Sequence, residues 1–273
     1  MTTKRRSWVT TVIALVLTAI MLFPLYWMIN VSLTQKDKLR ADPPPLFPSN
    51  PNFDGYDKVI HEQLPYLGTS FLVGLGTVIV TLLVAAPAGY SLAKLRPWGG
   101  TALNFGLLVA QMIPGIIMAM GFYLIFNSWG LLNTVWGLII ADTTLAVPFG
   151  VLIFTAFMMG IPNELIQAAR IDGAGHWRTF RSIVLPVSRN SIVTVSLFAF
   201  LWSWSDFLFS STLNRGGALQ TITIGIYRYL GNNTQDWNAI MATAVVASVP
   251  AAFLLVIAQR YVAAGVTAGA IKD

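Results

Sequence analysis

The residues best suited to specific contacts lie in one polar stretch, residues 162–189, between long hydrophobic segments. Its charged and titratable side chains are Glu164, Arg170, Asp172, His176, Arg178, Arg181 and Arg189. Charged groups at this density are too costly to place in lipid, so the stretch is expected to lie in water beside the membrane. Its mixture of acids, bases and apolar residues predicts a docking surface.

The order of residues in this stretch predicts two short helices joined at Gly173. Pro162 suits the first position of a helix, and Glu164 in the first turn is favoured by the helix dipole. Gly173 readily takes the left-handed conformation that ends a helix. Beyond it, Trp177, Phe180 and Val184 share one face. That apolar face fits docking to a partner, or an amphipathic segment lying on the membrane surface.

The spacing in this stretch resembles the cytoplasmic coupling loop of ABC importer permeases, whose pattern is Glu-Ala-Ala, three residues, Gly, nine residues, Ile-x-Leu-Pro. Here Ala168-Ala169, Gly173 and Ile183-Val184-Leu185-Pro186 stand at those positions, and Gln167 replaces the glutamate. The amide keeps a hydrogen bond to the ATPase but loses an ion pair. The resemblance implies that an ATPase is contacted by Glu164, Gln167, Ala168, Ala169, Asp172, Gly173, Trp177, Phe180, Ile183, Leu185 and Pro186.

The composition of the rest of the chain is that of a polytopic membrane protein. Of 273 residues, 55% are hydrophobic and 10% are charged, against about 25% charged in a soluble domain. A span needs roughly 20 apolar residues. The uncharged runs predict an all-α protein of one domain, residues 1–273, whose coupling loop covers 161–188. Six membrane helices are expected, over about 8–31, 67–93, 103–126, 134–159, 189–211 and 239–261.

The distribution of Lys and Arg predicts that both chain ends are cytoplasmic. In that orientation eleven basic residues are inside: Lys4, Arg5, Arg6, Lys94, Arg96, Arg170, Arg178, Arg181, Arg189, Arg260 and Lys272. Six are outside: Lys36, Lys38, Arg40, Lys58, Arg215 and Arg228. The net charge of +6 then reflects topology and contact with anionic headgroups of membrane lipid, and no nucleic-acid partner is expected.

Several chemistries are excluded by the residues themselves. Cysteine is absent, and the two histidines, His61 and His176, fall in loops on opposite sides of the membrane, so no metal site is expected. The sequence has no phosphate-binding motif of the G-x-x-x-x-G-K-[ST] type, so the chain is not expected to bind or hydrolyse ATP. The apolar run from Val9 to Ile29 is too long for a signal peptide and predicts a retained first helix.

A candidate substrate path lies within the predicted membrane helices. Asp142 lies in the fourth predicted helix, close to the midplane of the membrane and next to Thr143. A carboxylate there should face the protein interior or a wet cavity, where it either accepts hydrogen bonds from substrate hydroxyls or belongs to a structural network. Gln111, Trp202 and Trp204 suit a polyol with apolar ring faces. Tryptophans near helix ends are, however, commonly interfacial anchors.

Other segments resemble the carbohydrate-uptake branch of the same permeases. They are Pro24–Met28 with Ser32-Leu33, Trp204-Ser205-Asp206-Phe207 and Gly265–Lys272. The resemblance implies a type I ABC importer permease fold in the plasma (inner) membrane of a prokaryote. It implies a second permease subunit, two ATPase subunits that carry ATP and Mg, and an extracytoplasmic solute-binding protein delivering a sugar or polyol. No cofactor is expected on this chain.

Two alternative functions are open on the sequence alone. A secondary transporter driven by an ion gradient needs coupling-ion groups at the midplane and often shows inverted repeats with broken helices. This chain offers one deep carboxylate and no visible repeat. A membrane-embedded enzyme would need a catalytic constellation, and the predicted helices contain neither cysteine nor histidine nor a close carboxylate pair.

Overall fold

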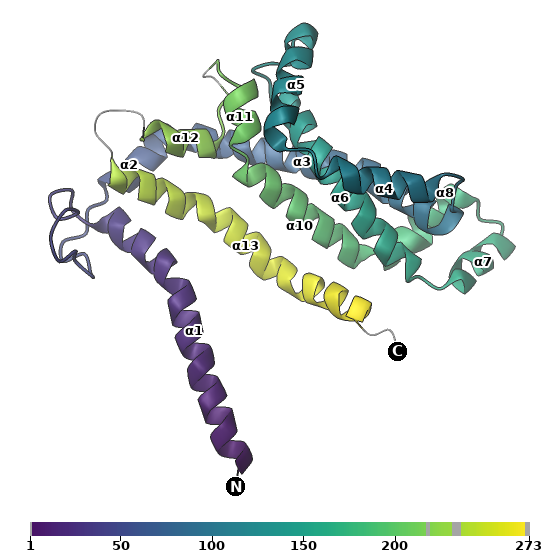
Figure 1. Ribbon diagram of the computed structural model, residues 1–273, viewed down its shortest axis with the longest axis horizontal. Helices are drawn as coiled ribbons and strands as arrows, with labels where there is room; N and C mark the ends of the chain where they lie inside the picture. The colour runs from purple at the N-terminus through teal and green to yellow at the C-terminus, as the bar shows by residue number, and fades with distance from the viewer. Residues whose placement is uncertain (1, 217–218, 231–235, 271–273) are drawn as a thin grey trace. The chain divides into compact units, whose positions relative to one another are not determined.

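A computed structural model describes residues 2–216, 219–230 and 236–270, and its described residues form helices joined by turns and loops (Figure 1). Lys272, one of the predicted inner cations, lies outside these residues. The chain divides into two compact units. One comprises Met1–Pro65 with Gly225–Val249, and the other comprises Tyr66–Ile224 with Pro250–Asp273.

The first unit contains the helices that flank the long connection after residue 33. They are α1 (Thr2–Leu33), α2 (Asp54–Lys58), the π-helical turn η1 (Val59–Gln63), part of α12 (Ile222–Arg228) and the start of α13 (Trp237–Ala270). Asp236 precedes α13 and accepts hydrogen bonds from Lys36 (2.9 Å) and Lys58 (2.5 Å). Asn238 donates to the carbonyl of Val31 at 3.0 Å, which ties α13 to the end of α1.

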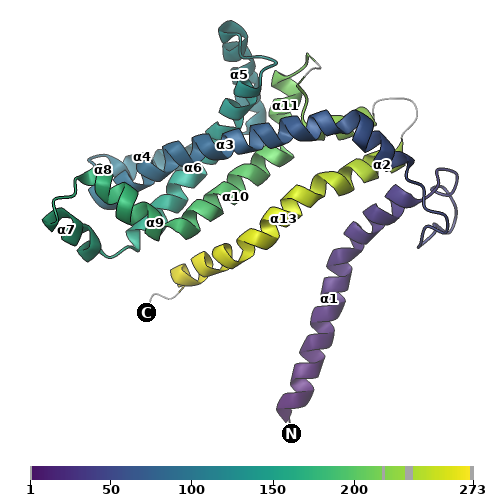
Figure 2. The ribbon, with the colours of Figure 1, turned by 180° about the vertical axis from the view of Figure 1, so that it is seen from behind.

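The second unit carries both candidate sites and is built around three long helices. Helices α3 (Leu64–Tyr90), α6 (Val135–Met159) and α10 (Arg189–Ser205) run alongside one another in both views (Figure 1, Figure 2). α3 ends in the π-helical turn η2 (Ser91–Leu95). A Cβ on Gly89 would lie 2.5 Å from Cβ of Phe154, so this glycine allows α3 and α6 to approach closely.

Two predicted helices are broken in the structure. Residues 103–126, expected as one helix, fall in α4 (Gly100–Ala110) and α5 (Gly115–Trp129), which meet at 96°. Pro114 lacks an N–H group and disfavours helix in the residue before it, which favours a break at this point. The helix expected over 189–211 is α10 followed by α11 (Leu208–Leu213). Asp206 between them is extended, and its carboxylate accepts the N–H groups of Phe209 (3.1 Å) and Ser210 (2.9 Å).

These breaks affect how many times the chain crosses a membrane. Within the described part of the chain, four continuous helical stretches are long and apolar enough to span: Trp8–Leu33, Asp54–Leu95, Val135–Met159 and Trp237–Tyr261. Counting each bent pair, Gly100–Ala110 with Gly115–Trp129 and His176–Val187 with Arg189–Ser205, as one span gives up to six. The chain is therefore an all-helical membrane protein with four to six candidate spans, and the predicted number of six stays a prediction.

Candidate functional site

The polar loop after α6 consists of four short helical pieces. They are α7 (Asn163–Ile171), α8 (His176–Thr179), the π-helical turn η3 (Phe180–Val184) and α9 (Leu185–Val187). Gly173 has a φ of 77° and follows the end of α7. The N–H of Gly173 donates to the carbonyl of Arg170 at 3.0 Å, and that of Ala174 donates to Ala169 at 2.9 Å. This pair of bonds is a Schellman motif, so the predicted helix end at Gly173 is confirmed.

One face of the loop is buried against the long helices. Phe180 and Val184 are 5% and 0% exposed and belong to the core cluster that α3, α6 and α10 also supply. The rings of Tyr90 and Phe180 lie 5.3 Å apart between centroids. Two of the three residues in the predicted apolar stripe therefore pack on protein. An amphipathic helix resting freely on the membrane would turn these side chains toward lipid and away from the protein, so the structure disfavours that alternative.

A lysine on η2 joins the loop to the end of α6. The Nζ atom of Lys94 donates to the carbonyl of Ile161 at 2.5 Å and to Oδ1 of Asn163 at 3.0 Å. Those acceptors flank the turn between α6 and α7, so a single cation fixes the point where the loop leaves the membrane helix. The sequence identifies Lys94 only as a topology signal, because no local pattern links it to residues almost seventy positions away.

The opposite face of α7 is open. Glu164, Gln167, Ala168 and Ile171 follow the i, i+3, i+4, i+7 spacing of one helix face and are all exposed. Ile171 is 86% exposed, which is unusual for an isoleucine at the end of a well-packed helix. The family resemblance does not include Ile171 among the contact residues, although its spacing from Gln167 and Ala168 places it on their face.

The predicted coupling residues thus separate by exposure. Glu164, Gln167, Ala168, Asp172, Gly173, Trp177 and Pro186 are exposed, Ile183 and Leu185 are half-buried, and Ala169 and Phe180 are buried. The exposed members are free to meet a partner. The buried members, with Ile166 and Val184, hold the loop on the membrane helices.

The second candidate site surrounds Asp142, which is 2% exposed on α6. Its Oδ2 atom accepts a 2.6 Å hydrogen bond from Oγ of Ser203 on α10. Its Oδ1 atom is buried and has no hydrogen-bond partner among the described residues, and the same holds for Oγ1 of Thr143. Asp142 therefore joins α6 to α10 and retains a free acceptor. Ser203 could not be found from sequence, because sixty-one positions separate it from Asp142.

The remaining predicted path residues lie in different surroundings. Trp202 is 46% exposed and lines a hollow of about 640 Å³ together with Phe198, Leu201 and Asp206. Trp204 is buried and stacks on Phe200 at 5.3 Å between ring centroids. Gln111 is exposed at the end of α4. The five residues thus do not form one continuous pocket.

Residues 85–268 match the family described as binding-protein-dependent transport system inner membrane component. The match includes the whole polar loop. The chain is an ABC importer permease. The sulfoquinovosyl glycerol transport permease SmoH of Agrobacterium fabrum is 33% identical over 254 residues, 92% of this chain and 89% of SmoH. The trehalose transport permease SugB of Mycobacterium tuberculosis is 30% identical over 255 residues, 92% of each chain.

The fold of this permease is also similar to that of a solved transporter. A chain of a bacterial ABC transporter involved in alginate import superposes with a TM-score of 0.79 at 19% identity. The superposition covers 94% of this chain and 96% of that one. At this identity the likeness concerns the fold alone, and the fold is that of ABC importer permeases. The permease therefore presents an anchored loop with one open face and, within its helices, a buried carboxylate with one free oxygen.

Proposed function

We propose that this permease imports a sugar or related polyol and that the open face of its loop receives the movements of an ATPase. The sugar class is supported by the names of two relatives, SmoH for sulfoquinovosyl glycerol and SugB for trehalose. Both are at least 30% identical over 92% of this chain. A pathway for such solutes needs hydrogen-bond acceptors and apolar surfaces inside the membrane.

The observation that carries the ATPase part of the proposal is the two-faced loop. Phe180 and Val184 fix it to the membrane helices, while Glu164, Gln167 and Ile171 face outward. A segment rigidly attached on one side and open on the other transmits a push from a partner to the helices beneath it. ATP and Mg would be bound by two partner ATPase subunits, because this sequence has no phosphate-binding motif of its own.

The assembly would contain a second permease subunit and, on the outer side, a solute-binding protein. Co-purification tests for the second permease subunit. The family description, which specifies binding-protein-dependent transport, supports the solute-binding protein. The loop and both chain ends would face the cytoplasm, as the excess of Lys and Arg in those segments favours. In the membrane, the free Oδ1 atom of Asp142 would accept a hydrogen bond from a substrate hydroxyl.

Transport by the reconstituted complex tests this function. The permease, its ATPase, its partner permease and the binding protein are placed in proteoliposomes with labelled trehalose or sulfoquinovosyl glycerol. Uptake should require ATP on the loop side and should persist when ionophores collapse ion gradients. Uptake that follows an ion gradient and ignores ATP would instead establish a secondary transporter.

Ile171 provides the test of the docking face. In the proposed complex the Ile171 side chain is buried against the ATPase. Ile171→Glu should remove that burial, which contributes about 1.5–3 kcal/mol to binding, and should weaken ATPase retention about 10- to 100-fold. The matched control is Leu46→Glu, because Leu46 is also exposed (60%) and lies in the connection after α1. Equal ATPase retention by the two variants, measured by pull-down from membranes, would remove Ile171 from the docking face.

A further inference from the structure

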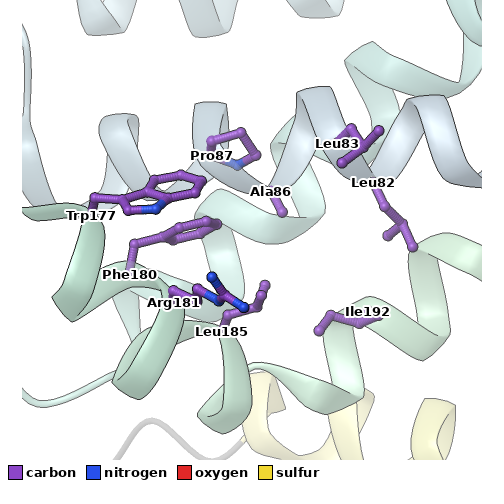
Figure 3. Close-up of a pocket in the computed structure, with 9 residues that line it drawn as sticks. All are labelled: Leu82, Leu83, Ala86, Pro87, Trp177, Phe180, Arg181, Leu185 and Ile192. Atoms are coloured by element: carbon purple, nitrogen blue, oxygen red, sulfur yellow. The ribbon is translucent and has the colours of Figure 1, made fainter.

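A hollow of about 370 Å³ lies beside the packed contact between the loop and two membrane helices, α3 and α10 (Figure 3). Its walls come from α3 between Leu82 and Pro87, from the loop between Trp177 and Leu185, and from Ile192 on α10. Figure 3 shows side chains from all three elements around this space. All of its lining residues are apolar except Arg181. An apolar space with a single cation on its loop wall, between Phe180 and Leu185, suits a ligand that is itself apolar with one anionic group.

The position of the hollow along α3 indicates where each part of such a ligand would lie. Leu83 precedes Leu95, the last residue of η2, by about 18 Å of helix at about 1.5 Å per residue. With the end of η2 and the polar loop at the membrane surface, the α3 wall would extend into the hydrocarbon layer. Arg181 belongs to the polar loop. The hollow would then run from the membrane surface toward the interior of the bilayer, as a lipid molecule does.

The charge around the hollow is positive. Arg181 is exposed and has no ion-pair partner among the residues for which side chains are described. The loop also carries Arg170, Arg178 and Arg189, against the acidic Glu164 and Asp172. Basic pockets between membrane helices suit the headgroups of anionic lipids. Trp177, 67% exposed, supplies the aromatic ring typical of the membrane–water interface.

We propose that this hollow binds an anionic phospholipid, with an acyl chain along α3 and the phosphate on Arg181. The site goes beyond the transport function and rests only on the loop lying at a membrane surface. A helix from a partner subunit fits less well. One helical turn, about 10 Å wide and 5.4 Å high, occupies about 400 Å³ or more, so the hollow holds less than one turn. An acyl chain is more slender than a helix and fits such a space.

Photolabelling of the assembled transporter tests the site. The complex is placed in nanodiscs containing either phosphatidylglycerol or phosphatidylcholine with a photoactivatable group in the acyl chain, and labelled peptides are identified by mass spectrometry. The phosphatidylglycerol probe should label peptides that contain Leu83 or Ile192 more strongly than the phosphatidylcholine probe. Arg181→Gln should lower phosphatidylglycerol labelling about fivefold. Arg178→Gln, which changes another exposed arginine of the same loop that does not line the hollow, should not.

A second variant tests the apolar wall without changing charge. Leu83 is 70% exposed and lines the hollow, so Leu83→Trp should fill space and reduce labelling by both probes. ATPase retention measured on the same samples reports whether each variant is folded and assembled. Equal labelling by both probes with no effect of Arg181→Gln would overturn the proposal. So would labelling of the isolated permease that disappears on assembly, since a partner protein would then cover the hollow.

Discussion

Asp142 is the residue whose chemistry most needs a direct test, because burial, a hydrogen bond and a free oxygen meet in one side chain. Its Oδ2 atom is held by Ser203, while Oδ1 has no partner among the described residues. A purely structural carboxylate would use the Ser203 bond alone. A substrate-binding carboxylate would also need the free oxygen.

We expect Asp142→Asn to keep part of the uptake, since the amide retains one acceptor. Asp142→Leu should lower uptake per assembled complex about tenfold, which corresponds to the loss of roughly one buried hydrogen bond. Ser203→Ala should instead destabilise the α6–α10 pair by about 1–2 kcal/mol and reduce the amount of complex. Labelled-solute uptake is normalised to ATPase retained. Normal uptake per complex in Asp142→Leu would leave this residue with a structural role only.

Among the elements, α7 depends on the backbone conformation at its end. Gly173 has a φ of 77°, and a Cβ there would meet no atom within 4 Å. A substitution is therefore penalised by its backbone preference and not by a clash. This separation allows two side chains of similar size to be compared.

Gly173→Val should cost about 1–2 kcal/mol in the left-handed conformation, misplace α7 and reduce ATPase retention about tenfold. Gly173→Asn is the matched control, because asparagine tolerates this conformation, and it should retain most of the binding. Membrane insertion should be unchanged in both. If pull-down shows the same loss for valine and asparagine, the conformation of Gly173 is not what docking requires.

The connection between α1 and α3 is held by a charge cluster at the start of α13. Burial alone would raise the pKa of Asp236, but hydrogen bonds from Lys58 and Lys36 outweigh burial and lower it. A lowered carboxyl pKa stabilises the fold at pH values above the ordinary value near 3.8, and the effect is lost as the pH falls through the folded value.

Asp236→Asn should therefore make the 34–58 segment more sensitive to protease at pH 7. The variant loses up to about 1 kcal/mol of stability for each partly exposed ion pair that is removed. Asp57→Asn is the control, because the side chain of Asp57 is 72% exposed and its ion pair among the described residues is with His61, at 3.4 Å. Limited proteolysis at pH 7 compares the two. Equal cleavage would mean that the cluster does not order this segment.

For the whole molecule, the open question is the orientation of the loops. Cysteine is absent, so single cysteines can be introduced without background. Ser49, Ser128 and Ser182 are exposed and fall in segments predicted to lie outside, outside and inside. An impermeant thiol reagent added to intact cells should label cysteines at 49 and 128, and should label one at 182 only after lysis. The reverse pattern would invert the topology and place the polar loop away from any cytoplasmic ATPase.

Much of this permease is determined by local sequence. Long apolar runs predict membrane helices because lipid excludes unpaired backbone groups, and the structure has α6 at Val135–Met159 where 134–159 was expected. Three other features can also be predicted from the sequence, because each depends on residues close together in the chain. They are the glycine that ends α7, the polar loop and the absence of an ATP-binding motif.

Contacts between distant residues were decided only by the tertiary structure. The packing of Phe180 on Tyr90, the Lys94 bridge to Ile161 and the Ser203 bond to Asp142 join positions 60 to 90 apart. Helices without charged patterns carry no signal for which residue on one meets which on another. The breaks at Pro114 and Asp206 depend on the balance between local preference and packing, so apolar runs alone predicted continuous helices there. An apolar composition is enough to stabilise a helix in lipid, whereas side-chain packing determines which other helices it contacts.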